Sequence, residues 1–183
     1  MNDGILVFVT DYYATETSIV QALSITRTFS GNRHMTINWV CKHHSDLGKE
    51  QLYAILQLRA EVFVVEQTCV FQDMDGADAQ CFHLLGESAR GLEAYARLVP
   101  AGLKYTEASI GRVVTLPAAR GGGLGHALMS EAVRALVSLW GAQPIRIGAQ
   151  AHLQAFYGQH GFAPAGPIYI EDGIDHIEMV RAA

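Results

Sequence analysis

The sequence predicts an α+β fold, a single domain in which helices flank one mixed sheet. Three observations lead to this prediction. Apolar runs of strand length alternate with stretches of helical periodicity. Several of these runs follow one another through short polar turns, as antiparallel strands do. Residues 110–148 read as strand, helix and strand, and a helical crossover makes those two strands parallel. With 183 residues, half of them hydrophobic, the chain suffices for one domain with a proper core and is too short for two comfortable ones.

The elements are expected in the following order. Residues 1–34 carry no catalytic pattern and are expected to form an extension, peripheral or disordered, with a short strand at 5–9 and a weak helix at 18–29. The recognisable domain covers 35–183. Its expected elements are a strand at 37–43, a helix at 51–67 weakened in its second half by β-branched residues, a polar loop at 72–80, a hairpin of strands at 82–86 and 92–99, a strand at 110–116, a helix ending at Gly141, a strand at 145–148, a short helix at 151–160 and a closing hairpin of 162–170 with 174–180.

A glycine-rich loop lies at the centre of this pattern. Pro117 ends a β-branched strand, and the segment Arg120-Gly121-Gly122-Gly123-Leu124-Gly125-His126 opens the next helix. The first turn of a helix presents unpaired N–H groups and the positive end of the helix dipole, and glycines let an anion approach the backbone. The loop is therefore a candidate phosphate site. It lacks the lysine and serine of a nucleotide-hydrolase P-loop, and His126 or Leu128 stands where the dinucleotide motif has its third glycine.

The spacing Arg-x-x-Gly-x-Gly, formed by Arg120, Gly123 and Gly125, resembles the acetyl-CoA pyrophosphate loop of the GNAT superfamily of N-acetyltransferases. A plain helix-capping loop is the alternative for this segment alone. A second match comes from Gln150 and Tyr157, which stand where that family has a polar residue at the end of its fifth strand and a tyrosine seven residues later. The family usually has asparagine at the first of these positions, so Gln150 departs from the pattern.

Further short segments extend the resemblance over residues 35–183 and make it similar to the ElaA-like bacterial subgroup. These segments are Leu58-Arg59, Val62-Phe63, Glu66-Gln67, Asp73-Met74-Asp75-Gly76, Gly148-Ala149-Gln150-Ala151-His152 and Glu171-Asp172-Gly173-Ile174.

The resemblance implies a fold in which the fourth and fifth strands of the domain splay apart, so that the pantetheine arm of acetyl-CoA substitutes for a strand. It also implies that Tyr157 protonates the leaving thiolate, although a core tyrosine is the alternative. The residues implied in binding acetyl-CoA are Val113, Val114, Thr115, Arg120, Gly121, Gly122, Gly123, Leu124, Gly125, His126 and Gln150.

The acceptor side is less specific. The central strand holds no glutamate, so the candidates for a base are Glu66, Asp75, Glu171 and His176, each of which also suits a solvated or capping role. The acidic residues of two loops could form a mouth that concentrates cations; ordinary polar turns are the alternative. We therefore expect the acceptor to be a small cationic amine or a lysine-bearing peptide. The residues expected at this mouth are Asp73, Asp75, Glu171 and Asp172.

Composition excludes several other classes of protein. The formal net charge of −5 argues against nucleic-acid binding. The chain has no apolar run long enough to span a bilayer and no secretory signal, so a cytoplasmic protein is expected. Three cysteines without CxxC spacing indicate free thiols, and eight histidines without metal-ligand spacing indicate no metal. The family suggests a homodimer. A GNAT-fold module that binds acyl-CoA without turnover, and an interaction protein that binds none, remain as alternatives.

Overall fold

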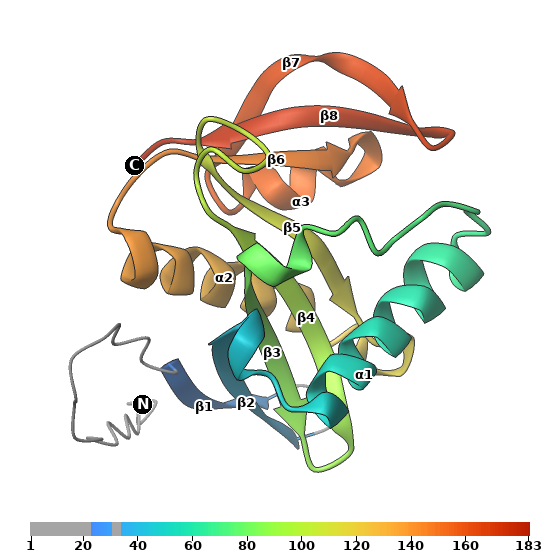
Figure 1. The fold of residues 1–183 in the computed structure, drawn as a ribbon, viewed down its shortest axis with the longest axis vertical. Helices are drawn as coiled ribbons and strands as arrows, with labels where there is room; N and C mark the ends of the chain where they lie inside the picture. The colour runs from blue at the N-terminus through green and yellow to red at the C-terminus, as the bar shows by residue number, and fades with distance from the viewer. Residues whose placement is uncertain (1–22, 31–33) are drawn as a thin grey trace.

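The structure is a computed structural model that describes residues 23–30 and 34–183 (Figure 1). Its eight strands form one sheet in the order β1-β2-β3-β4-β5-β6-β8-β7. All neighbouring pairs are antiparallel except β5 and β6, which are parallel. The predicted α+β architecture with a mixed sheet is therefore confirmed.

The elements have the following bounds. The strands are β1 (Leu23–Ser30), β2 (His34–His43), β3 (Phe82–Ser88), β4 (Gly91–Val99), β5 (Ala108–Thr115), β6 (Ile145–Gln150), β7 (Phe162–Glu171) and β8 (Ile174–Arg181). The helices are α1 (Lys49–Arg59), α2 (Leu124–Trp140) and α3 (Gln154–Gly158), and a π-helical segment, Ala60–Glu66, continues α1.

Two hydrophobic clusters occupy the two faces of the sheet. Neighbouring residues of β3 show the separation: Leu84 belongs to the cluster built with Leu128 and Leu136 of α2, whereas Leu85 belongs to the cluster built with Ile55 of α1. Successive side chains of a strand point to opposite faces, so α1 and α2 cover opposite sides of the sheet. In the described part of the chain, no helix is long and apolar enough to cross a membrane.

The pairing between β5 and β6 stops after two residues. Ala108 pairs with Ile145 and Ser109 with Arg146, and beyond these pairs the two strands separate. On its other side β5 pairs with β4 through an irregular register, and Arg112 adopts a left-handed φ of 52° within that irregularity. The splay implied for these strands is therefore present, and it leaves most of one edge of β5 open.

Two expectations about local structure need correction. The helix expected at 18–29 is wrong over Leu23–Phe29, which forms β1 and pairs with β2 along its whole length. Alternating apolar and hydroxyl residues such as Ile25 and Thr26 suit a strand, and pairing along a neighbouring strand outweighs their weak helical pattern. The strand expected at 5–9 lies outside the described residues. The helix expected at 51–67 begins at Lys49 and widens into the π-helical segment at Ala60.

Candidate active site

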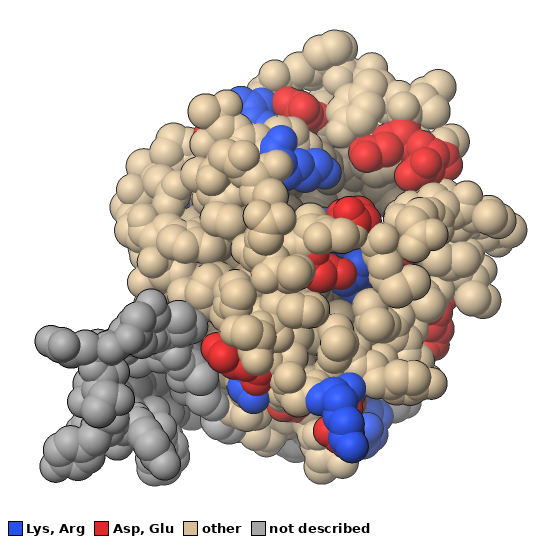
Figure 2. All heavy atoms as spheres, viewed as in Figure 1, with Lys and Arg blue, Asp and Glu red and all other residues tan. Residues whose placement is uncertain are grey.

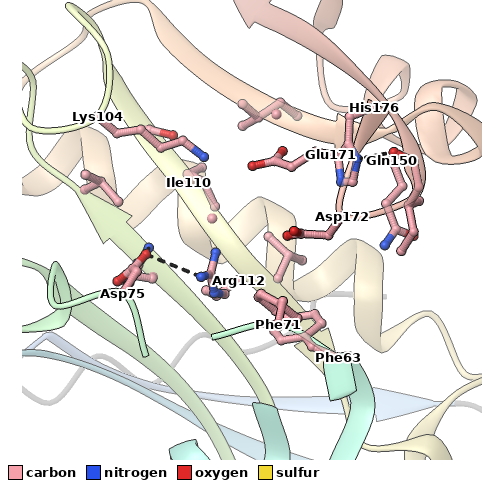
Figure 3. Close-up of a pocket in the computed structure, with 18 of the residues that line it drawn as sticks. Phe63, Phe71, Asp75, Lys104, Ile110, Arg112, Gln150, Glu171, Asp172 and His176 are labelled. Carbon is pink, nitrogen blue, oxygen red and sulfur yellow. Dashed lines mark hydrogen bonds and ion pairs between the residues drawn. The ribbon is translucent and has the colours of Figure 1, made fainter. Parts of the chain in front are cut away.

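The surface is hollowed between the β4–β5 loop and the β7–β8 hairpin (Figure 2). The hollow is a cavity of about 680 Å³ that occupies the opening between β5 and β6. Its walls come from the loop after α1, from β5 and β6, and from the hairpin (Figure 3). Tyr157 is among the lining residues, so a cleft connects the open edge of β5 with this tyrosine.

The open edge of β5 offers backbone groups to a ligand. Val113 lines the cavity, while Val114 pairs with Tyr95 of β4 and is buried against α1. In the part of the chain that the structure describes, no strand pairs with 110–115 on the β6 side. Because unpaired backbone amides are costly to bury, this edge is suited to a ligand that carries amides of its own.

Two glycines of the loop have a left-handed backbone. Gly121 and Gly123 have φ values of +88° and +82°, a left-handed conformation that side chains other than glycine rarely adopt. Gly123 is the N-cap of α2, and Leu124 anchors the first turn in the core. No heavy atom lies within 4 Å of the position that a Cβ would take at residues 121–123. The need for glycine at residues 121 and 123 therefore comes from the backbone conformation and not from crowding.

Arg120 is bound by a residue that was itself a site candidate. Its Nη1 and Nη2 donate to the Glu66 carboxylate at 2.6 and 2.8 Å, and Nη2 also lies 3.3 Å from the carbonyl oxygen of Thr115. The hydrogen bonds from Arg120 lower the pKa of Glu66. Glu66 is not among the residues that line the cavity. Its place and its partner argue against the expectation that Glu66 acts as the base.

Tyr157 is both a core residue and a cavity residue. Its side chain is 8% exposed and packs edge-on against the rings of Phe156 and Phe162. Burial raises the pKa of Tyr157 to about 12, so the phenol keeps its proton at neutral pH. The two interpretations drawn from the sequence, a core tyrosine and a proton donor, are therefore compatible.

Gln150, at the end of β6, reaches across the cleft. Its Nε2 donates to Oε1 of Gln67 at 3.2 Å, and both residues line the cavity. Gln67 follows the π-helical segment after α1, so the contact joins elements 83 residues apart in the chain. The segment Glu66-Gln67 contributes to the family resemblance, but no role in the site is expected for Gln67 from the sequence.

Three arginines and three aspartates, which we call the arginine–aspartate network, join α1, β4 and β5 to the polar loop at 72–80. The buried Arg59 Nε donates to Asp73 at 2.8 Å and its Nη1 to Asp78 at 2.9 Å. The remaining contacts are those of Arg97 with Asp75 at 2.6 Å and with Asp78 at 2.8 Å, and of Arg112 with Asp73 at 2.7 Å and with Asp75 at 3.3 Å.

This network corrects the roles expected for Asp73 and Asp75. Asp73 is buried, and its carboxylate is shared between two guanidinium groups. Asp75 lines the cavity, but hydrogen bonds from Arg97 hold its pKa well below the usual range. A carboxylate so strongly paired is a poor base and attracts an external cation weakly. The charge of this loop is therefore balanced within the protein and does not form an acidic mouth.

The β7–β8 hairpin brings the other acceptor candidates to the cavity, where Glu171, Asp172 and His176 are lining residues (Figure 3). His176 Nδ1 lies 2.9 Å from the carbonyl oxygen of Ile174. A carbonyl only accepts, so Nδ1 is the donor and the neutral ring has its lone pair on Nε2. Of the candidates for a base, His176 is the one whose hydrogen bonding leaves a free nitrogen lone pair at the cavity.

Several lining residues carry no signal in the sequence. Lys104 comes from the β4–β5 loop, and Cys69 comes from the loop after α1, where its thiol lies 3.5 Å from the carbonyl oxygen of Asp172. Cys41, Cys69 and Cys81 are free thiols. Within residues 23–30 and 34–183, no group of three or more His, Cys, Asp or Glu side chains is placed to hold a metal ion.

Comparisons with known proteins agree with this geometry. A family model described as an acetyltransferase (GNAT) domain matches residues 58–183. The chain is 46% identical to the protein ElaA of Escherichia coli K12 over 147 residues, which cover 79% of this chain and 96% of that protein. A crystal structure of an acyl-CoA N-acyltransferase from Pseudomonas aeruginosa is 49% identical, with a TM-score of 0.75 over 79% of this chain and 99% of its own. A crystal structure of E. coli ElaA gives the same TM-score and the same two coverages at 46% identity.

Proposed function

The chain belongs to the GNAT acetyltransferase family and is an acyltransferase, and from this premise we propose that it transfers an acetyl group from acetyl-CoA directly to a primary amine. The observation that carries the proposal is the open edge of β5, which faces a cavity that reaches Tyr157. The open edge of β5 suits the amide-bearing pantetheine arm, and Tyr157 suits proton transfer.

In this proposal, acetyl-CoA is bound both by backbone groups and by the positive charge of a side chain. The free edge of β5 at Val113 hydrogen-bonds the pantetheine amides in place of a neighbouring strand. The N–H groups of Gly121 to Gly125 hold the pyrophosphate at the start of α2. Arg120 adds positive charge beside that loop, and Gln150 lines the cavity at the end of β6. This division places the thioester between β5 and β6, within the cleft that contains Tyr157.

The transfer removes two protons from the nitrogen of the protonated amine and delivers one proton to the sulfur. The amine nitrogen uses its lone pair to form a C–N bond to the acetyl carbon, and the electrons of the C–S bond pass to sulfur. Tyr157, protonated at neutral pH, gives its proton to that thiolate. Nε2 of His176 accepts the first proton, which the ammonium group loses before the attack, either directly or through water, and later releases it to solvent. The second proton leaves the nitrogen once the C–N bond has formed and returns to the phenolate of Tyr157, which gives a neutral amide and restores the tyrosine. Among the described acidic residues that line the cavity, Glu171 and Asp172 have no arginine partner, and they favour an acceptor that is cationic at its amine, such as a small amine or a lysine side chain.

The proposal is tested by thiol release over a panel of primary amines, with wild type, Tyr157→Phe and Tyr53→Phe compared. Tyr53 is a matched control because it lies on α1 and is 72% exposed. We expect wild type to release CoA, Tyr157→Phe to lower kcat about 100-fold without a large change in the Kd of CoA, and Tyr53→Phe to change neither. Tight CoA binding with no release on any amine would instead identify a non-catalytic acyl-CoA-binding module.

His176 is tested separately. His176→Gln removes the Nε2 lone pair, whereas His152→Gln changes an exposed histidine on the segment before α3. We expect the first substitution to lower kcat/KM by about tenfold or more and the second to leave it unchanged. Equal activity of the two variants would assign proton removal to another group or to solvent.

A further inference from the structure

The mouth of the cavity carries opposite charges on its two sides. Figure 2 shows blue, basic atoms over the β4–β5 loop, whose one basic residue is Lys104, and red, acidic atoms over the β7–β8 hairpin across the hollow. In Figure 3 the amino end of Lys104 extends into the cavity from one side, with Glu171 on the other. The two sides belong to segments that are about 67 residues apart in the chain and meet only in the folded molecule.

Lys104 is a cationic residue of this cavity whose charge is not balanced by an ion pair with a described residue. Two arginines, Arg97 and Arg112, also line the cavity. Both belong to the arginine–aspartate network, in which three positive charges are paired with three negative charges. Lys104 makes no ion pair with any residue in the described ranges; its ammonium group lies 5.2 Å from the centroid of the Tyr105 ring. The β4–β5 side therefore presents one unbalanced positive charge to the cavity.

The hairpin side presents the opposite charge. Neither Glu171 nor Asp172 forms an ion pair with another described residue, and both line the cavity. His176 lies on the same hairpin, with Nε2 available for the proton of an amine. A simple polyamine would match this side but would bring positive charge against Lys104. An acidic amine, in contrast, matches both sides.

We propose that the acceptor carries an acidic group as well as its reactive amine, as a free amino acid does. Lys104 binds the acidic group, while Glu171 and His176 receive the amine. This inference rests on the proposed function and narrows its acceptor. Apolar residues such as Phe63, Phe71 and Leu103 also line the cavity and offer contacts to an aliphatic or aromatic part of the acceptor. The volume of the cavity, about 680 Å³, is that of a site for small molecules.

The test compares amino acids with their carboxamides, which keep the amine and lose the acidic charge. Thiol release gives kcat and KM for each member of the pair with wild type, Lys104→Met and Lys49→Met. Lys49 is the matched control, because it is an exposed lysine of α1 that pairs with Glu50. We expect wild type to favour the acid over its carboxamide by about tenfold in kcat/KM, which is typical for a hydrogen bond to a charged group.

Lys104→Met is expected to abolish that preference by raising KM for the acid about tenfold more than KM for the carboxamide. Lys49→Met should keep the preference. Carboxamides used as well as acids by wild type would overturn the inference and leave the proposed function standing. An equal loss for both acceptors in Lys104→Met would overturn it too, because Lys104 would then support the loop alone. No thiol release with any amine would remove the proposed function itself.

Discussion

Arg120 and Glu66 form a two-pronged ion pair that ties the glycine loop to the end of the π-helical segment after α1, with N–O distances of 2.6 and 2.8 Å. The guanidinium group belongs to the motif expected to bind pyrophosphate, so the pair brings a carboxylate close to the site of a polyanion. Both side chains are more than one third exposed. The pair therefore contributes little to stability and can rearrange when a ligand binds.

Glu66→Gln is expected to tighten the binding of CoA. The substitution removes a negative charge beside the pyrophosphate loop and releases Arg120. We expect Kd, measured by titration calorimetry at low ionic strength, to fall about two- to fourfold, and the difference to shrink as salt is added. Glu50→Gln, on the far end of α1, serves as the control and should leave Kd unchanged. Weaker binding in Glu66→Gln would show that Glu66 positions Arg120 for the ligand.

Asp73→Asn is expected to destabilise the fold. Arg59 is fully buried, and Asp73 accepts hydrogen bonds from both Arg59 and Arg112. Loss of the carboxylate charge leaves the buried guanidinium of Arg59 with one of its two carboxylate partners, Asp78, a change that costs about 3 kcal/mol. Urea unfolding would measure it, with the exposed Asp46→Asn as the control. A change below about 0.5 kcal/mol, the usual size for a surface substitution, would show that the arginine–aspartate network is not important for stability.

The stability of the protein should depend on pH through His83. This buried residue lies between the hydroxyl of Tyr95, 2.8 Å from Nδ1, and the carbonyl oxygen of Asp78, 3.1 Å from Nε2. Since the carbonyl only accepts, Nε2 carries the proton and Nδ1 accepts from the tyrosine. Burial lowers the pKa of His83 from 6.5 to about 4. The folded protein therefore holds the ring neutral over a range in which the unfolded chain protonates it.

The sign of this dependence follows from linkage. The contribution of His83 is complete above pH 6.5 and is lost as the pH falls towards 4, because the unfolded state binds the proton first. The loss amounts to about 3 kcal/mol over that interval. Urea unfolding between pH 4 and 7.5 would measure it in wild type, His83→Gln and the exposed control His152→Gln. The slope should flatten in His83→Gln alone; identical slopes in all three proteins would exclude this residue as the cause.

Gly86→Ala is expected to disturb the core between β2 and β3. A Cβ at this position would lie 2.6 Å from Cζ3 of Trp39, whose side chain is 1% exposed and cannot move aside. Such overpacking costs about 2 kcal/mol. Thermal or urea unfolding would detect this loss. Gly166→Ala is the matched control, because it lies in β7 with open space around the added carbon; the same loss in both variants would point to strand propensity rather than to the tryptophan.

Patterns within a few residues of one another predicted much of this molecule. The periodicity of α2, the β-branched run of β5 and the turn between β7 and β8 were all found where the sequence places them. The glycine loop lies before α2 as expected, and its Gly121 and Gly123 adopt a left-handed backbone that other residues avoid. The family resemblance supplied the splayed strands and Tyr157, which local chemistry by itself would have left as a core tyrosine.

Patterns of neighbouring residues did not predict which charged side chains pair with one another. Asp73 and Asp75 read as ordinary acidic loop residues, and only the fold places them against Arg97 and Arg112, which are 22 and 39 residues away. Likewise β1 became a strand because β2 offers an edge to pair with.

The amino-acid sequence alone thus determined the helices, most strands of the mixed sheet and the glycine loop. These features depend on residues that lie two to four positions apart in the chain. Which carboxylates are neutralised, and the position of Lys104 opposite Glu171 across the cavity, were decided by the tertiary structure. Charges interact through space, and the distances between them exist only after the strands have assembled.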